Sequence, residues 1–206
     1  MAEPIIHHRH PEFNAIFTRV NENLRYLFQT KQPVLTLASS GTGGVESTFV
    51  SLFSPGDTVI AVNGGKFGER WVKMPRTFGL NAVEIKTDWG KAPTTAQIMT
   101  ALRSHPNAKA VYLVHSETST GTVTDVKTLA HVINDNSDAL VCVDGITAIG
   151  AHEFRFDEYG HAHDVHGALL FTEQQARPFP RCGTRPPGCG WIPAHRRSSR
   201  SPGVCS

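Results

Sequence analysis

Apolar side chains recur along the chain at two spacings, and each spacing predicts a different kind of element. Residues 11–30 carry them at intervals of three and four, as on one face of an amphipathic helix. The residues on that face are Phe13, Ile16, Phe17, Val20, Leu24, Leu27 and Phe28. Elsewhere, short and nearly continuous apolar runs such as 110–114 are typical of buried strands. The two patterns alternate as far as residue 143.

This alternation predicts an α/β fold in which helices connect the strands of a largely parallel sheet. Strands are expected at 34–38, 58–62, 81–85, 110–114 and 139–143, and helices at 11–30, 45–53, 67–78, 94–104 and 125–134. Pro33 separates the first helix from the first strand, and Thr94 and Thr95 are candidate N-caps. Sheets of this kind bind ligands at the carboxyl ends of their strands, so site residues are expected there.

Composition and charge narrow the classes of protein that fit this pattern. Apolar residues make up 39% and charged residues 18%, which suits a folded core better than a disordered chain. The net charge of +2 favours neither a nucleic-acid partner nor a membrane surface. No apolar run approaches the roughly 20 residues of a membrane span, and residues 1–10 lack the apolar stretch of a secretory signal. We therefore expect a soluble protein of the cytoplasm.

The composition changes sharply near Gly160. All seven lysines lie before it, from Lys31 to Lys127. Residues 160–206 contain no lysine, yet they hold six of the 13 arginines, six of the 13 prolines and three of the four cysteines. One interpretation is a disordered basic tail, and another is a segment read out of frame or from a retained intron. Residues 1–160 thus form the predicted domain, and residues 161–206 a divergent tail.

Three polar signals follow predicted strands. A glycine-rich turn at 39–44 offers a helix N-terminus and the Thr42 hydroxyl to a phosphate, while a Ser/Thr-rich loop occupies 115–121. Asp144 closes an apolar strand and would suit a cationic ligand nitrogen. Together they describe a site for a flat, phosphorylated ring with a protonatable nitrogen, which pyridoxal 5'-phosphate matches. Each signal taken alone also has a purely structural interpretation, as a turn, a capping loop or a strand-end cap.

Several segments, in order and at family-like spacing from Pro4 to about Gly160, resemble the class V aminotransferases of fold type I. The resemblance is closest to the alanine–glyoxylate and serine–glyoxylate branch. The segments are Ile5-Ile6-His7-His8-Arg9, Pro11-Glu12-Phe13, Ser40-Gly41-Thr42-Gly43, Phe67-Gly68-Glu69-Arg70-Trp71, His115 to Gly121 and Val143-Asp144. The resemblance implies a homodimeric transaminase that uses pyridoxal 5'-phosphate to move an amino group from alanine or serine to glyoxylate. It leaves a peroxisomal or mitochondrial location open for a full-length relative.

The resemblance also implies roles for individual residues. The phosphate would be held by the turn, the pyridine ring would stack on an aromatic side chain, and its nitrogen would pair with a carboxylate. Hydroxyl groups would flank the ring. The residues implied are Thr42, Gly43 and Gly44 for the phosphate, Phe67 for stacking, Asp144 for the nitrogen, and Thr118 and Thr147 for the flanks. Phe67 as a core residue and Thr147 as a turn residue are the structural alternatives.

The chain departs from the family pattern at three places. The Schiff-base lysine is expected about 25 residues after Asp144, but residues 161–176 contain no lysine. The small C-terminal domain with the carboxylate-binding arginine and an N-terminal proline-glycine segment are also missing. Because the match ends near Gly160, where the composition changes and the lysine-free tail begins, the out-of-frame interpretation of the tail is favoured. We expect the chain to be inactive as a transaminase and assign no catalytic residue.

Two other hypotheses about the function remain open. The chain is either a non-catalytic truncated subunit that pairs with a full-length relative, or a small module that binds a phosphorylated ligand. Clusters of histidine and cysteine suggest metal sites, but their spacing lacks the usual partners, and we predict no metal. These clusters are His7, His8 and His10; His161, His163 and His166; and Cys182, Cys189 and His195.

Overall fold

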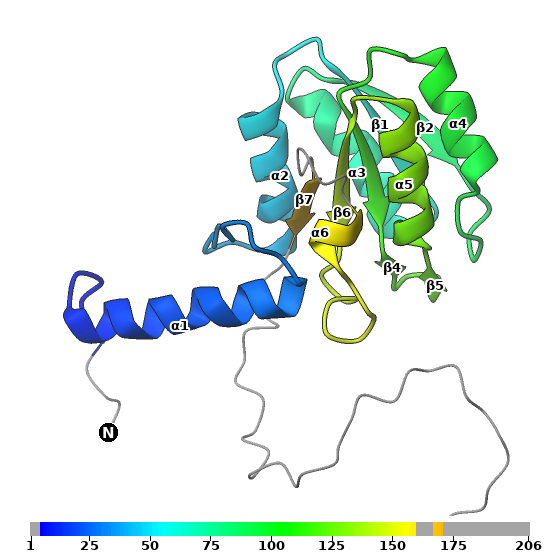
Figure 1. Cartoon of the computed structure of the whole chain (residues 1–206). Coiled ribbons are helices and arrows are strands. Elements are labelled where there is room, and N and C mark those ends of the chain that lie inside the picture. Colours follow the sequence, from blue (N-terminus) through cyan, green and yellow to red (C-terminus); the bar gives the residue numbers. More distant parts are fainter. Residues whose placement is uncertain (1–4, 160–166, 171–206) are drawn as a thin grey trace, which may run out of the picture. The chain divides into compact units, whose positions relative to one another are not determined.

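The computed structural model describes residues 5–159 and, for the backbone, residues 167–170. In this part of the chain, five strands form one sheet in the order β2-β1-β3-β6-β7, and all neighbouring strands run parallel (Figure 1). The strands are β1 (Thr58–Asn63), β2 (Asn81–Lys86), β3 (Ala110–Val114), β6 (Leu140–Asp144) and β7 (Gly167–Leu170). The predicted α/β class with a parallel sheet is confirmed.

Helices connect the strands and cover both faces of the sheet (Figure 1). The helices are α1 (Pro11–Phe28), α2 (Gly41–Leu52), α3 (Lys66–Thr77), α4 (Thr95–Ser104), α5 (Val126–Asn136) and α6 (Phe156–Tyr159). A short antiparallel hairpin, β4 (Ser116–Glu117) with β5 (Thr122–Val123), follows β3. Thr94 caps α4 through a capping box with Gln97, which confirms one of the two predicted N-caps.

The central strand β1 shows how the sheet separates two cores. Ile60 and Val62 face the core formed with α4 and α5, whereas Val59 and Ala61 face the core formed with α2 and α3. Successive side chains of a strand point to opposite faces, so a strand covered on both sides reads as one continuous apolar run. Burying each large side chain contributes roughly 1.5–3 kcal/mol.

The long helix α1 buries its apolar stripe unevenly. Phe28 is buried and Leu24 and Leu27 pack beside it against the core on the α4/α5 side. Further toward the N-terminus, Ile16 and Phe17 are 48% and 43% exposed. The spacing of apolar residues therefore predicted the helix correctly, but its last turns alone are anchored on the core.

The expected strand at 34–38 is wrong, because this segment is irregular. Leu35 is 89% exposed, and no strand of the described sheet pairs with the segment. The following helix, α2, begins at Gly41 rather than at residue 45, because Ser40 caps it. The two-residue strands β4 and β5 were not predicted, since so short an element shows no period.

Within the described residues, no helix is long and apolar enough to cross a membrane. The predictions about the tail concern residues that lie mostly outside the described part of the chain. They include the lysine-free segment 161–176, the second histidine cluster and the Cys182, Cys189 and His195 set. The boundary at residue 160 stays a prediction.

Candidate functional site

The polar signals that follow β3 and β6 meet at the carboxyl edge of the sheet. Val114 and Asp144, the last residues of these two strands, are paired in register. The Ser/Thr-rich loop starts beside them, because the His115 N–H donates to the carbonyl oxygen of Asp144 at 2.9 Å. Two segments that lie about 30 residues apart in the sequence thus form one wall of a candidate site.

Asp144 is buried, with 7% of its surface exposed, and each carboxylate oxygen accepts one hydrogen bond. The Ile146 N–H donates to Oδ1 at 3.2 Å, and the Trp71 indole Nε1–H donates to Oδ2 at 3.1 Å. Burial raises the pKa of Asp144, and these two hydrogen bonds act in the opposite direction. The result is an oriented carboxylate at a strand end, as a cationic ring nitrogen would require.

The glycine-rich turn forms the first turn of α2 rather than a loop between a strand and a helix. The Gly43 N–H donates to the Ser40 hydroxyl at 3.3 Å, and the Gly44 N–H donates to the Ser40 carbonyl at 2.9 Å. A Cβ at Gly43 would collide with the Ser39 hydroxyl, so a larger residue at this position requires the Ser39 side chain to turn away. A phosphate held by the Gly43 N–H would have to displace its long hydrogen bond to Ser40, and the Gly44 N–H is already bonded to the Ser40 carbonyl.

Arg70 on α3 connects this turn to the rest of the site. Its Nη1 donates to Thr42 Oγ1 at 3.0 Å, and its guanidinium carbon lies 5.5 Å from the centre of the Phe67 ring. The positive charge also favours the ionised form of Asp144. Arg70 was not among the predicted site residues, although a cation beside a phosphate turn favours an anionic ligand. It also lines an open groove along α3, with Lys66, Glu69, Lys73, Met74 and Thr77.

Glu117 is a second residue that sequence reasoning missed. It is 3% exposed, and its Oε2 accepts hydrogen bonds from the N–H groups of Phe67 and Gly68 at 3.2 and 3.0 Å. Its Oε1 accepts from the hydroxyl of Ser119 at 2.5 Å. Glu117 therefore caps the N-terminus of α3, which begins after Gly65 without a side-chain cap of its own. The sequence gives no sign of such a cap, because Glu117 lies 50 positions after Phe67 and 49 positions after Gly68.

Phe67, Thr118 and Thr147 lie around this edge. Phe67 is half-buried in the first turn of α3, where its N–H donates to the Glu117 carboxylate. Thr147 donates its hydroxyl hydrogen bond to the Ser116 carbonyl at 3.2 Å and so ties the loop after β6 to the loop after β3. Thr118 is exposed in the latter loop. Side chains and N–H groups of α3 form hydrogen bonds to α2, to the end of β6 and to Glu117. Helix α3 therefore connects the elements that carry the predicted residues.

His115 is a buried side chain behind the Ser/Thr-rich loop. Its Nδ1 has no hydrogen-bond partner among the described residues, and its ring packs 5.5 Å from His152 and 5.9 Å from Phe154. Burial, and secondly the neighbouring His152, lower the pKa of His115 to about 4. The imidazole is therefore neutral at pH 7.

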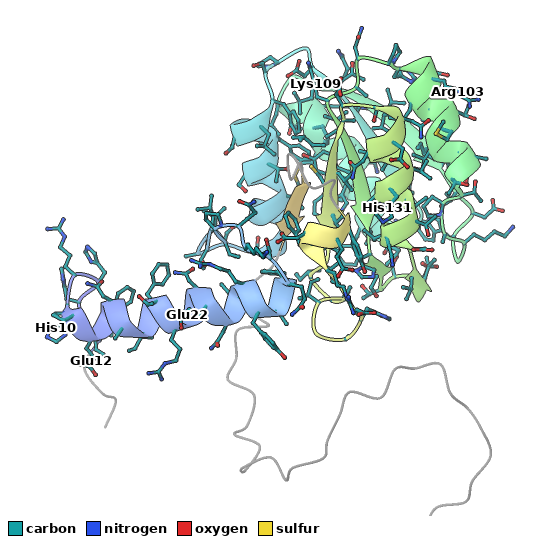
Figure 2. The ribbon with its side chains drawn as sticks, viewed as in Figure 1. His10, Glu12, Glu22, Arg103, Lys109 and His131 are labelled. Carbon is teal, nitrogen blue, oxygen red and sulfur yellow. The ribbon has the colours of Figure 1, made fainter. Side chains whose placement is uncertain are left out.

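The first histidine cluster does not gather around a common point with acidic ligands. His10 serves instead as the N-cap of α1, and its Nδ1 accepts from the Glu12 N–H at 3.3 Å (Figure 2). Among the described residues, no group of three or more His, Cys, Asp or Glu side chains is placed to hold a metal ion.

The comparison with protein families decides how this arrangement is classified. The model of the aminotransferase class-V family matches residues 3–165. The chain belongs to the class-V aminotransferase family. The matched residues contain the whole candidate site, from the first turn of α2 to the loop after β6.

Two curated proteins and one solved structure are similar to this chain over about three quarters of its length. The "soluble hydrogenase 42 kDa subunit" of Anabaena cylindrica is 38% identical over 162 residues, which are 78% of this chain and 42% of the relative. The L-aspartate–glyoxylate aminotransferase of Paracoccus denitrificans is 35% identical over 162 residues, 76% of this chain and 41% of the relative. The crystal structure of an alanine–glyoxylate aminotransferase from a Nostoc species matches with a TM-score of 0.72 at 29% identity. That match covers 76% of this chain and 41% of the other.

Proposed function

We propose that residues 1–160 are the cofactor-binding portion of a pyridoxal 5'-phosphate-dependent aminotransferase of the alanine/serine–glyoxylate type. The observation that carries the proposal is Asp144, a buried carboxylate at the end of β6 whose two oxygens are each oriented by a donor. Relatives named as glyoxylate aminotransferases support the substrate class, an amino acid with a 2-oxo acid. The chain spans about 42% of the length of the Anabaena cylindrica relative. The activity of the whole enzyme is therefore part of the proposal.

The residues at the sheet edge fit this cofactor chemically. The first turn of α2 with Thr42 and Arg70 suits the phosphate, and Phe67 offers a ring for stacking on the pyridine. Asp144 would accept a charge-assisted hydrogen bond from the protonated ring nitrogen, which contributes about 1.5–3 kcal/mol. Thr118 and Thr147 would flank the ring. When bound, the cofactor supplies an electron sink for reactions at the α-carbon of an amino acid.

The chain does not offer the lysine that the family uses for covalent attachment and proton transfer. No lysine follows Lys127, and an arginine cannot replace the amine because its guanidinium stays protonated. We therefore propose non-covalent binding of pyridoxal 5'-phosphate and little or no transamination by this chain. The homodimer, like the substrate pair, belongs to the proposal for the intact enzyme.

Binding of pyridoxal 5'-phosphate to the purified full chain tests the proposal. Equilibrium dialysis with wild type and with Asp144→Asn measures the dissociation constant, and Asp138→Asn is the matched control, because Asp138 is exposed just before β6. We expect saturable binding by wild type, the same affinity for the control, and about 10- to 100-fold weaker binding for Asp144→Asn. Equal binding by Asp144→Asn, or no saturable binding by wild type, would contradict the proposal.

A further inference from the structure

We infer that Trp71 is a positioning residue that fixes the Asp144 carboxylate for the ring nitrogen of the cofactor. The inference rests on the proposed function and adds a role for a side chain that the site prediction did not include. The Trp71 indole is buried, with 2% of its surface exposed, and its Nε1–H lies 3.1 Å from Asp144 Oδ2. The bond joins α3 to the end of β6 across 73 positions of sequence.

The geometry of the carboxylate explains why this bond matters. The Ile146 N–H holds Oδ1 and the Trp71 indole holds Oδ2, so the plane of the carboxylate is defined by one donor on each oxygen. An ionised carboxylate has about four acceptor positions, and two of them remain for a ligand. Without the indole, the second oxygen would lose its donor inside a buried environment, and the group would turn more freely about its last torsion.

The chemistry of the donor also suits this task. An indole N–H is neutral and donates only, so it orients the carboxylate without cancelling its charge. A lysine or arginine at the same place would form an ion pair and compete with a cationic ring nitrogen. Arg70, whose positive charge favours the ionised form of Asp144, donates its hydrogen bond to Thr42 instead. The indole therefore orients the Asp144 carboxylate without forming an ion pair with it.

The position of Trp71 on α3 is set by contacts at the helix start. Glu117 accepts from the Phe67 and Gly68 N–H groups, and Phe67 lies one helical turn before Trp71. Residues four apart on a helix share a face, so one rigid element carries both the predicted stacking ring and the indole donor. This arrangement fixes the distance between the ring-stacking surface and the carboxylate.

Trp71 also packs in the core formed with α2, so its test must separate packing from hydrogen bonding. Trp71→Phe keeps an aromatic ring but removes the N–H, and Trp89→Phe is the matched control, because Trp89 is 54% exposed and lies after β2. Two ligands are compared on the full chain: pyridoxal 5'-phosphate and its analogue in which a C–H replaces the ring nitrogen.

We expect Trp71→Phe to weaken binding of pyridoxal 5'-phosphate about tenfold, with no comparable effect on the analogue. The double variant Trp71→Phe/Asp144→Asn should bind pyridoxal 5'-phosphate no more weakly than Asp144→Asn alone, because the two side chains act together. Trp89→Phe should match wild type for both ligands. Equal weakening for both ligands by Trp71→Phe would assign Trp71 a packing role and overturn the inference.

A measurement on wild type keeps the inference testable if Trp71→Phe does not fold. The indole N–H resonance of Trp71 in a 15N-labelled sample should shift as Asp144 ionises, and this shift should disappear in Asp144→Asn. A resonance that is indifferent to Asp144→Asn would overturn the inference. Should wild type fail to bind pyridoxal 5'-phosphate, the proposed function fails, while the indole titration still decides whether Trp71 controls Asp144.

Discussion

Two buried titratable side chains near the carboxyl edge of the sheet respond to pH in opposite directions. Burial raises the pKa of Asp144, so its ionisation opposes folding as the pH rises through that pKa. Burial lowers the pKa of His115 to about 4, so protonation of this imidazole opposes folding as the pH falls. Sequence alone identified Asp144 from its place at a strand end. The sequence identified His115 only as part of a polar loop, because the burial of a single polar residue cannot be predicted from its type.

The His115 contribution to stability is fully present above pH 6.5, its pKa in the unfolded chain, and is lost as the pH falls toward about 4. This one group should lower the free energy of unfolding by about 2 kcal/mol between pH 7 and pH 5. His152 repels and Asp125 attracts the charged form of His115, and both remain in the variant. Urea unfolding of His115→Asn at the two pH values should lack this decrease.

His8→Asn is the control for that measurement, because His8 is exposed and should leave the pH dependence of wild type unchanged. A pH dependence that is identical in His115→Asn and wild type would show that His115 is not the titrating group.

Helix α3 shows which part of an element its own sequence determines. The apolar spacing at 67–78 predicted the helix, and the structure places it at Lys66–Thr77 despite Pro75. Its cap, however, comes from Glu117 on β4, and its contacts with Thr42 and Asp144 come from Arg70 and Trp71. Local periodicity carries no information about such partners. For the same reason the apolar run at 34–38 predicted a strand, although no strand of the described residues pairs with it.

Loss of the Glu117 cap should destabilise the protein through α3. Glu117→Ala leaves the Phe67 and Gly68 N–H groups without their acceptor and should lower the free energy of unfolding by about 2–3 kcal/mol. Glu117→Gln keeps one acceptor oxygen and should lose about half as much. Urea unfolding measures both, with Glu46→Ala as the control, because Glu46 is exposed on α2. If Glu117→Ala were as stable as the control, the cap would not support α3.

The described part of the molecule is a sheet whose carboxyl edge gathers the candidate site, and this much was predictable. Alternating helices and strands imply parallel strands, and parallel strands align their carboxyl ends. The strand order was not predictable, because the pairing of β3 with both β1 and β6 depends on contacts between distant segments. The proposed function separates binding of the cofactor from catalysis, because residues 161–176, where the resemblance places the Schiff-base lysine, contain no lysine.

Reduction with borohydride after loading with pyridoxal 5'-phosphate separates these two properties directly. The full chain is saturated with the cofactor, divided into reduced and unreduced portions, dialysed, and mapped by mass spectrometry. We predict saturable binding of the cofactor, and dialysis should reverse this binding in the unreduced portion. Asp144→Asn should weaken the binding. After reduction, no single lysine should carry a stoichiometric adduct. A stoichiometric adduct at a single lysine, such as Lys66 beside Phe67, or the absence of saturable binding, would contradict this account.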